Sequence, residues 1–204
     1  MDATDTDRYA IVGSGKIGAA LAELFTRAGI EVGIANTRGP DSLRELAASR
    51  GPALRPLSLT EALEREIIFL AVPFPAIPQV GAARPDWTGK LVVDTTNAHY
   101  SPGSEDVLQG RASAHYTAGM LPGATVVKAF NQLPAATLTA ELDAGAGRRV
   151  VFIAADEPAA GDRIAALAGA LGLAAVQLGR IDEGGRLIQV PGPLVLRHLV
   201  ERPL

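Results

Sequence analysis

The sequence predicts an α/β protein with a doubly wound, mainly parallel sheet of about eight strands and a small C-terminal extension. Three observations lead to this fold class. Short apolar runs rich in Val and Ile recur along the chain, segments of helical period lie between them, and a glycine motif directly follows the first run. A length of 204 residues suits one compact domain of this class with a modest extension.

The expected strands follow from the apolar runs, and the expected helices from periodicity and capping signals. The first helix carries Ile17, Leu21 and Phe25 on one apolar face and ends at Gly29. Capping boxes at Ser42-x-x-Glu45 and Ser58-x-x-Glu61 predict two further helix starts, and a later helix spans about 159–171. Strands are expected near Tyr9–Val12, Glu31–Ala35, Arg55–Leu57, Ile67–Val72, Leu91–Asp94, Thr125–Ala129, Val150–Ala154 and Ala174–Leu178.

The glycine motif has the context of a dinucleotide-binding loop. Gly13-Ser14-Gly15-Lys16-Ile17-Gly18 matches G-x-G-x-x-G between the first strand and the first helix, which is the arrangement of a Rossmann fold. Gly13 makes the tight turn, Gly15 admits the pyrophosphate, and Gly18 lets the helix pack on the strand. The free N–H groups of the helix N-terminus then face the phosphates. A ligand-free glycine turn is the alternative interpretation.

The residues after the second strand indicate which cofactor binds. NAD-binding relatives of this fold carry an acid there for the ribose hydroxyls, whereas this chain has Asn36, Thr37 and Arg38. A hydroxyl and a guanidinium suit a 2′-phosphate, so we expect NADPH. The alternative is that Arg38 is an ordinary surface charge and Asp41 supplies the acid from a shifted register.

Composition excludes several classes of function. The formal net charge is -3, so no cationic surface is expected for nucleic acid or for an anionic membrane. Cysteine is absent, which removes disulfides and thiolate chemistry, and the three histidines lack ligand-like spacing, so no metal is expected. The acidic start of the chain does not resemble a signal peptide, and no apolar run approaches membrane length. We therefore expect a cytoplasmic protein.

Five segments in order resemble the deazaflavin-dependent NADP oxidoreductase family. They are Gly13–Gly18, Ile34–Leu43, Ala71–Phe74, Val93–Asn97 and Val126–Asn131, and together they cover about the first two thirds of the chain. The Asn-Thr-Arg-Gly-Pro and Val-Lys-Ala-Phe-Asn stretches are the most specific. The phosphate loop departs from the Gly-x-Thr/Asn-Gly-x-x-Gly of archaeal members, which places the chain among bacterial NADPH-dependent reductase relatives.

The resemblance implies direct hydride transfer between NADPH and the ring of deazaflavin coenzyme F420, or of a similar flavin. It places Thr37 and Arg38 at the 2′-phosphate and the loop of Val72, Pro73 and Phe74 beside the nicotinamide ribose. Strand ends agree with this, because ligands in open α/β sheets bind at the carboxyl ends of the strands. Further residues at such ends are expected to contact cofactor or acceptor, with turn capping as the alternative for the asparagines: Asn97, Ala129 and Asn131.

The inventory of proton donors is sparse. No Tyr-x-x-x-Lys is present, which excludes a short-chain dehydrogenase site, and the chain is too short for the helical domain of hydroxyacid dehydrogenases. His99 is the candidate acid, because a histidine pKa suits proton transfer, with a surface histidine as the alternative. Tyr100 is the alternative donor for a carbonyl or imine substrate, and His115 is a weaker candidate than His99. Lys128 is expected to reach a phosphate or a substrate anion, or to extend its amine past the core edge.

Residues 1–130 are expected to form the NADP-binding Rossmann domain, and residues 131–204 an α/β extension that completes the acceptor site and a homodimer contact. The nearly uncharged run 187–196 is the reason for the dimer, since so small a chain could scarcely cover it alone. The alternative is that this run forms an edge strand or short helix folded back on its own sheet. The preferred function is an NADPH-dependent oxidoreductase with a deazaflavin or flavin-like acceptor. The alternatives are a reductase of small carbonyls or imines and a non-catalytic NADP(H)-sensing module.

Overall fold

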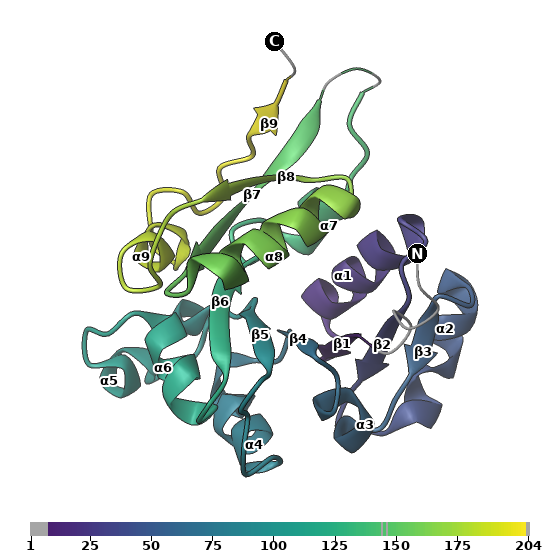
Figure 1. Ribbon diagram of the computed structural model, residues 1–204, viewed down its shortest axis with the longest axis horizontal. Coiled ribbons are helices and arrows are strands. Elements are labelled where there is room, and N and C mark those ends of the chain that lie inside the picture. The colour runs from purple at the N-terminus through teal and green to yellow at the C-terminus, as the bar shows by residue number, and fades with distance from the viewer. Residues whose placement is uncertain (1–7, 144, 146, 203–204) are drawn as a thin grey trace.

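A nine-stranded sheet forms the centre of the molecule (Figure 1). The structure is a computed structural model, and it describes residues 8–143, 145 and 147–202. Each of the eight expected strands is present, with ends within two residues of the prediction, and β9 is an addition. The strands are β1 (Tyr9–Val12), β2 (Val32–Ala35), β3 (Leu54–Pro56), β4 (Ile67–Leu70), β5 (Leu91–Asp94), β6 (Thr125–Ala129), β7 (Arg148–Ala155), β8 (Ala174–Gln177) and β9 (Val200–Glu201).

The strand order confirms the doubly wound fold. Along the sheet it runs β3-β2-β1-β4-β5-β6-β7-β8, and the first six strands in this order are parallel to one another. β7 then runs antiparallel to β6, β8 is parallel to β7, and the short β9 pairs antiparallel with β7. The order reverses between β1 and β4, and ligands of such sheets bind at the carboxyl ends of the strands beside this reversal.

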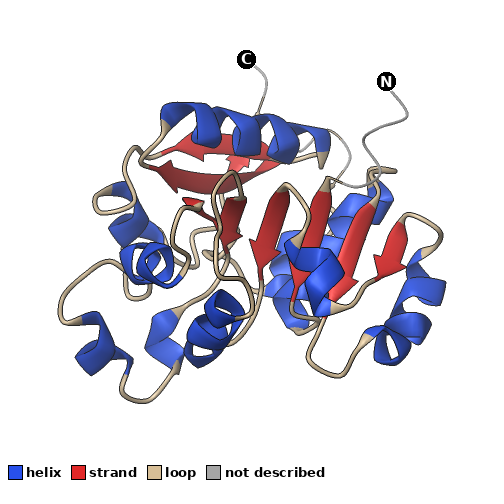
Figure 2. Ribbon diagram, turned by 60° about the horizontal axis from the view of Figure 1, so that its bottom comes forward, coloured by secondary structure: helices blue, strands red, loops and turns tan. Residues whose placement is uncertain are grey.

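Helices cover both faces of the sheet (Figures 1 and 2). The α-helices are α1 (Lys16–Arg27), α2 (Arg44–Arg50), α3 (Leu59–Leu63), α4 (Ile77–Ala82), α5 (Ser104–Leu108), α6 (Ser113–Met120), α7 (Ala135–Thr139), α8 (Pro158–Ala170) and α9 (Gly184–Ile188), and the 3-10 helices are η2 (Pro40–Leu43), η3 (Phe74–Ala76) and η4 (Ala98–Tyr100). Helices α1, α7 and α8 contribute to one buried apolar cluster, and α3, α4 and α6 to another.

Strand β1 shows why the core has two sides. Tyr9 and Ile11 belong to the cluster that includes α1, whereas Ala10 and Val12 belong to the opposite one. Successive strand residues point to opposite faces, so a strand buried on both sides reads as a continuous apolar run. Among the described residues no helix is long and apolar enough to cross a bilayer, and no group of three or more potential ligands could hold a metal ion.

One of the two expected capping boxes is present. Ser58 accepts a hydrogen bond from the backbone N–H of Glu61, and the Glu61 carboxylate accepts from the backbone N–H of Ser58. The prediction of a box at Ser42 was wrong. The Ser42 hydroxyl donates to the Gly39 carbonyl at 2.7 Å, because the 3-10 helix η2 occupies this segment before α2 begins. Gly29 follows α1 with a φ of +69°, as expected of a terminating glycine.

Candidate active site

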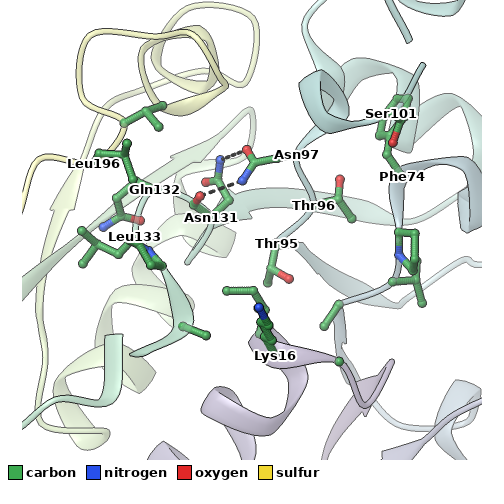
Figure 3. Close-up of a pocket in the computed structure, with 18 residues that line it drawn as sticks. Lys16, Phe74, Thr95, Thr96, Asn97, Ser101, Asn131, Gln132, Leu133 and Leu196 are labelled. Atoms are coloured by element: carbon green, nitrogen blue, oxygen red, sulfur yellow. Dashed lines mark hydrogen bonds between the residues drawn. The ribbon is translucent and has the colours of Figure 1, made fainter. Parts of the chain in front are cut away.

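A cavity of about 540 Å³ opens at the carboxyl ends of β1, β4, β5 and β6 (Figure 3). Four segments that directly follow these strands supply most of its wall, and a fifth comes from the C-terminal part of the chain. The lining residues are Gly15, Lys16, Ile17, Ala71, Val72, Pro73, Phe74, Thr95, Thr96, Asn97, Ser101, Asn131, Gln132, Leu133, Pro134, Ala135, Val195 and Leu196. The cavity thus lies where the strand order predicts a ligand.

The three glycines of the phosphate loop differ in what surrounds them. A Cβ on Gly13 would lie 2.2 Å from the Ala71 carbonyl oxygen, and one on Gly18 would lie 1.9 Å from the Gly13 oxygen. Packing within the chain therefore excludes a side chain at both positions. A Cβ on Gly15 meets no atom within 4 Å, and its backbone is extended, with a φ of -73°. Nothing in the described part of the fold requires glycine there, whereas a ligand approaching the helix N-terminus would.

Asn36 joins the phosphate loop to the segment after β2. Its amide nitrogen donates to the Ser14 hydroxyl at 3.0 Å and to the Ser42 hydroxyl at 3.1 Å. Its side-chain oxygen accepts the backbone N–H of Arg38 at 2.9 Å, which forms a turn that brings Thr37 and Arg38 to the surface. Arg38 is therefore exposed, and it lies outside the lining of the cavity.

Phe74 both packs within the protein and lines the cavity. The ring is 4% exposed and packs on Tyr116 with a centroid distance of 5.0 Å. It also lines the cavity, together with Val72 and Pro73. The loop after β4 is therefore a packed wall of the cavity.

Two asparagines from neighbouring strand ends bind each other across the cavity floor (Figure 3). Asn97 donates to the Asn131 carbonyl at 2.9 Å, and the Asn131 amide donates to Asn97 Oδ1 at 3.0 Å and to the Ile188 carbonyl at 2.7 Å. Between β6 and Asn131, Phe130 takes a φ of +59°, which is strained for a residue with a side chain. This turn sets the direction of Asn131.

Three oxygens of the cavity wall are buried without a hydrogen-bond partner: Thr96 Oγ1, Asn131 Oδ1 and Gln132 Oε1. An unpaired buried polar atom costs about 1–3 kcal/mol, and these three oxygens find no partner within the described chain. The Asn131 amide nitrogen already has two acceptors, and the Gln132 amide donates to the Val150 carbonyl at 3.2 Å. The donor and acceptor ends of both side chains are thereby fixed.

The C-terminal segment closes one side of the cavity. The Leu196 N–H donates to the Gln132 carbonyl at 2.8 Å, which holds Val195 and Leu196 against the wall. Leu196 is nevertheless 63% exposed.

A buried ion pair supports the loop after β5. Lys128 Nζ lies 3.2 Å from Asp94 Oδ2, both side chains are fully buried, and the amine also donates to the Thr96 carbonyl at 2.5 Å. Asp94 accepts the Thr96 N–H and the Thr117 hydroxyl, each at 2.8 Å. Burial lowers the pKa of Lys128, and the charge of Asp94 opposes that shift. The pair fixes the loop that presents Thr95, Thr96 and Asn97.

The structure brings together most, though not all, of the residues expected at the site. Of the phosphate loop, Gly15, Lys16 and Ile17 line the cavity, while Ala129 is buried in the apolar core. His99 and His115 are exposed and lie outside the lining. The side chain of Tyr100 lies outside the described residues. Neither expectation for Lys128 was correct, because its amine is consumed by Asp94 inside the molecule.

Sequence reasoning missed several residues of the wall. Gln132 and the segment Leu133–Ala135 directly follow a strand end, so the rule that selected Asn131 could also have found them. Thr95 and Thr96 lie within the stretch that carried the family resemblance. Ser101 had no comparable signal.

The comparisons with known proteins agree with this geometry. Residues 8–98 match the family described as NADP oxidoreductase coenzyme F420-dependent. The chain is 41% identical to a hypothetical protein from Sinorhizobium meliloti whose structure it matches with a TM-score of 0.88, over 95% of each chain. A structure from Arthrobacter sp., with a proposed activity as an F420-dependent NADP-reductase, is 24% identical, with a TM-score of 0.69 over 85% of each chain, and shows the shared fold.

The chain is also 28% identical over 190 residues to metalloreductase STEAP3 of Rattus norvegicus. This match covers 92% of the chain and only 37% of that relative, so it concerns one part of a longer protein. The family match begins just before β1 and ends in η4, so it contains the phosphate loop and the ends of β1, β4 and β5 at the cavity. The segment after β6 and the C-terminal residues of the wall lie beyond it. Residues 8–98 therefore place this part of the chain in the coenzyme F420-dependent NADP oxidoreductase family.

Proposed function

We propose that this protein binds NADPH and transfers its hydride to the ring of a deazaflavin or flavin-like acceptor. The observation that carries the proposal is the cavity at the carboxyl ends of β1, β4, β5 and β6, with a phosphate loop on one side and unpaired buried amide oxygens on the other. The family match supports NADP(H) as the cofactor. The identity of the hydride acceptor is our proposal.

The residues present fit the cofactor. The open space above Gly15 and the N-terminus of α1 suit the pyrophosphate, and the exposed Arg38, held through its N–H by Asn36, suits the 2′-phosphate. The wall of Val72, Pro73 and Phe74 would exclude water from the nicotinamide end. NADPH supplies the hydride, and the chain binds, orients and shields the two reacting rings.

The acceptor side is lined by Asn97, Asn131, Gln132 and the C-terminal residues Val195 and Leu196. Unpaired oxygens on Asn131 and Gln132 favour a ligand edge that carries N–H donors, which deazaflavin and flavin rings have. Hydride transfer to such a ring requires little acid–base catalysis by protein side chains. This agrees with the cavity wall, in which no histidine or carboxylate stands among the described lining residues.

Reduction of a small carbonyl or imine receives less support from the geometry. That reaction needs a positioned proton donor, and His99, the candidate from the sequence, lies outside the lining. The polar lining side chains are amides, hydroxyls and the exposed Lys16. A purely sensory module would need no second site, whereas this cavity extends well beyond the phosphate loop.

An acceptor panel with NADPH deuterated on one face of its nicotinamide tests the proposal. The expected result is label transfer to oxidised F420 or to a flavin, with little turnover of simple ketones and imines. Transfer to a carbonyl substrate instead would contradict the assigned acceptor class. Binding of NADPH without any turnover across the panel would favour the sensory module.

We also propose that residues 131–204 complete the acceptor site and that the protein works as a homodimer. The exposed Leu196 and Leu199 are the features that favour a second copy. A chain ending at Asp182 should lose turnover with NADPH, because Asn131 loses its Ile188 partner and the Leu196 wall disappears. Light scattering compares its mass with that of the full chain. Unchanged mass and activity would contradict both roles.

A further inference from the structure

A second cavity of about 310 Å³ lies away from the candidate active site, between the C-terminal ends of α1, α7 and α8. Arg27 from α1 and Arg149 from β7 line it. Apolar side chains of Leu24, Leu171 and Leu173 form other parts of the wall. The cavity thus places two arginine side chains beside an apolar surface.

Arg149 is the unusual member of this pair, because it is a buried cation without a counter-ion in the described part of the chain. Its residue is only 4% exposed, yet no carboxylate among the described residues lies within 4 Å of its guanidinium. Its neighbour Arg148 shows the usual pattern: it is exposed and pairs with Glu201 at 2.5 Å. A buried charge is costly unless it is paired, so the expected partner is missing from the described chain.

The hydrogen bonds of Arg149 to described residues use two of the three nitrogens of its guanidinium. Its Nε donates to His198 Nε2 and its Nη1 to the Leu138 carbonyl, both at 3.0 Å, whereas Nη2 donates to no described group. Arg27 donates to the adjacent carbonyl of Thr139 at 3.1 Å, so both guanidiniums gather at the end of α7. Burial lowers the pKa of Arg149, and the positive charge of Arg27 adds to that effect.

The carboxylates nearby do not neutralise the pair. Glu23 lies 3.9 Å from Arg27 and is shared with Arg50, which it contacts at 2.9 Å. Glu141 lines the cavity but is exposed and pairs with neither guanidinium. The cavity therefore carries an excess of positive charge.

We propose that this cavity binds a small multivalent oxyanion of the phosphate class. Two guanidiniums supply the fork-shaped donors that match phosphate oxygens, and the low dielectric of the apolar wall strengthens the attraction. The bound anion fixes the end of α7 and, through His198, the C-terminal segment. Both elements continue into the wall of the active site at Ala135 and Leu196.

Thermal unfolding in increasing phosphate, against chloride at equal ionic strength, measures the binding. The wild-type protein should gain stability in phosphate. Arg27→Gln should weaken the phosphate Kd about tenfold, since it removes one charge-assisted donor from a side chain that is partly exposed and tolerant of change. Arg149→Gln should abolish the response. Arg148→Gln removes the neighbouring exposed arginine, which pairs with Glu201 and does not line the cavity. It is the matched control and should respond as the wild type does.

Two further arms distinguish this cavity from the cofactor loop and from a simple pairing with Glu141. Arg38→Ala should keep the phosphate response; loss of the response there, with Arg27→Gln unaffected, would place the anion at the cofactor loop and overturn the proposal. A response that appears only in Glu141→Gln would also overturn it, because that carboxylate would then be the partner of the arginines. Glycerol phosphate in place of phosphate distinguishes the sources: tighter binding indicates a phosphate monoester, and equal or weaker binding the free ion.

Discussion

The buried pair of Asp94 and Lys128 offers the sharpest test of how the candidate site is built. Both side chains are fully buried, and the amine has two oxygen partners, Asp94 Oδ2 and the Thr96 carbonyl. Lys128→Met removes the cation while nearly keeping the volume. Asp94 would then be a buried carboxylate with only the Thr96 N–H and the Thr117 hydroxyl as described donors.

Breaking a buried pair on one side costs about 3–5 kcal/mol. For a chain of this size 1 kcal/mol shifts the Tm by roughly 2–4 °C, so Lys128→Met should lower it by about 6–20 °C at pH 7.

The double variant Asp94→Asn with Lys128→Met is the decisive comparison, measured by calorimetry beside the two single variants. It removes both charges and keeps an acceptor for the Thr96 N–H, so it should recover most of the lost stability. A double variant as unstable as Lys128→Met would refute the reasoning, since the loss would then come from packing. A single variant with a change below about 1 kcal/mol would refute it as well.

Three other predictions concern the cofactor loop and the fold. Arg38→Ala should weaken NADPH by about 10- to 150-fold and leave NADH unchanged, as calorimetric titration with Arg44→Ala as control would measure; equal weakening of both cofactors would contradict the 2′-phosphate assignment. Gly15→Val should abolish cofactor binding yet keep the wild-type circular dichroism and Tm, whereas Gly18→Val should unfold the protein, because its Cβ meets the Gly13 carbonyl. Hydrogen bonds from Ser58 lower the pKa of Glu61, so its contribution to stability is present at neutral pH and is lost as the pH falls below about 4; the Tm difference between the wild type and Glu61→Gln should vanish there, and a constant difference would contradict this origin.

The fold could be predicted because its signals are local. Most of the eight expected strands are short apolar runs, and the glycine motif marked the first crossover from strand to helix. The exception is β3, which contains the exposed Arg55. The prediction of a capping box at Ser42 was wrong because a different type of helix begins there. Pro40 starts a 3-10 helix whose tighter turn brings the Ser42 hydroxyl to the Gly39 carbonyl instead of to the next helix. Spacing alone cannot distinguish the two helix types.

The cavity could be predicted only in part, because its walls have two origins. The walls formed by the segments after β1, β4, β5 and β6 follow from one topological rule and needed no side-chain detail. The fifth wall depends on where residues 189–199 return to the sheet. That return depends on individual long-range contacts, such as those of Leu196 with Gln132, Gln189 with Ser113 and Leu199 with Val150, for which the sequence contains no periodic signal.

Titratable residues near strand ends were the least predictable, and Lys128 shows the physical reason. A lysine one residue before the end of a strand could reach solvent, a ligand or a buried partner. The free-energy cost of burying its charged amine differs greatly among these three environments. The register of β5 against β6 decides among them, since it sets Asp94 directly beside Lys128. Once the parallel order of these strands is assumed, two opposite charges at matching ends of apolar strands predict the pair. The same reasoning gives nothing for His99, which follows its strand by several residues, so that the intervening turn, and not the sheet, sets its direction.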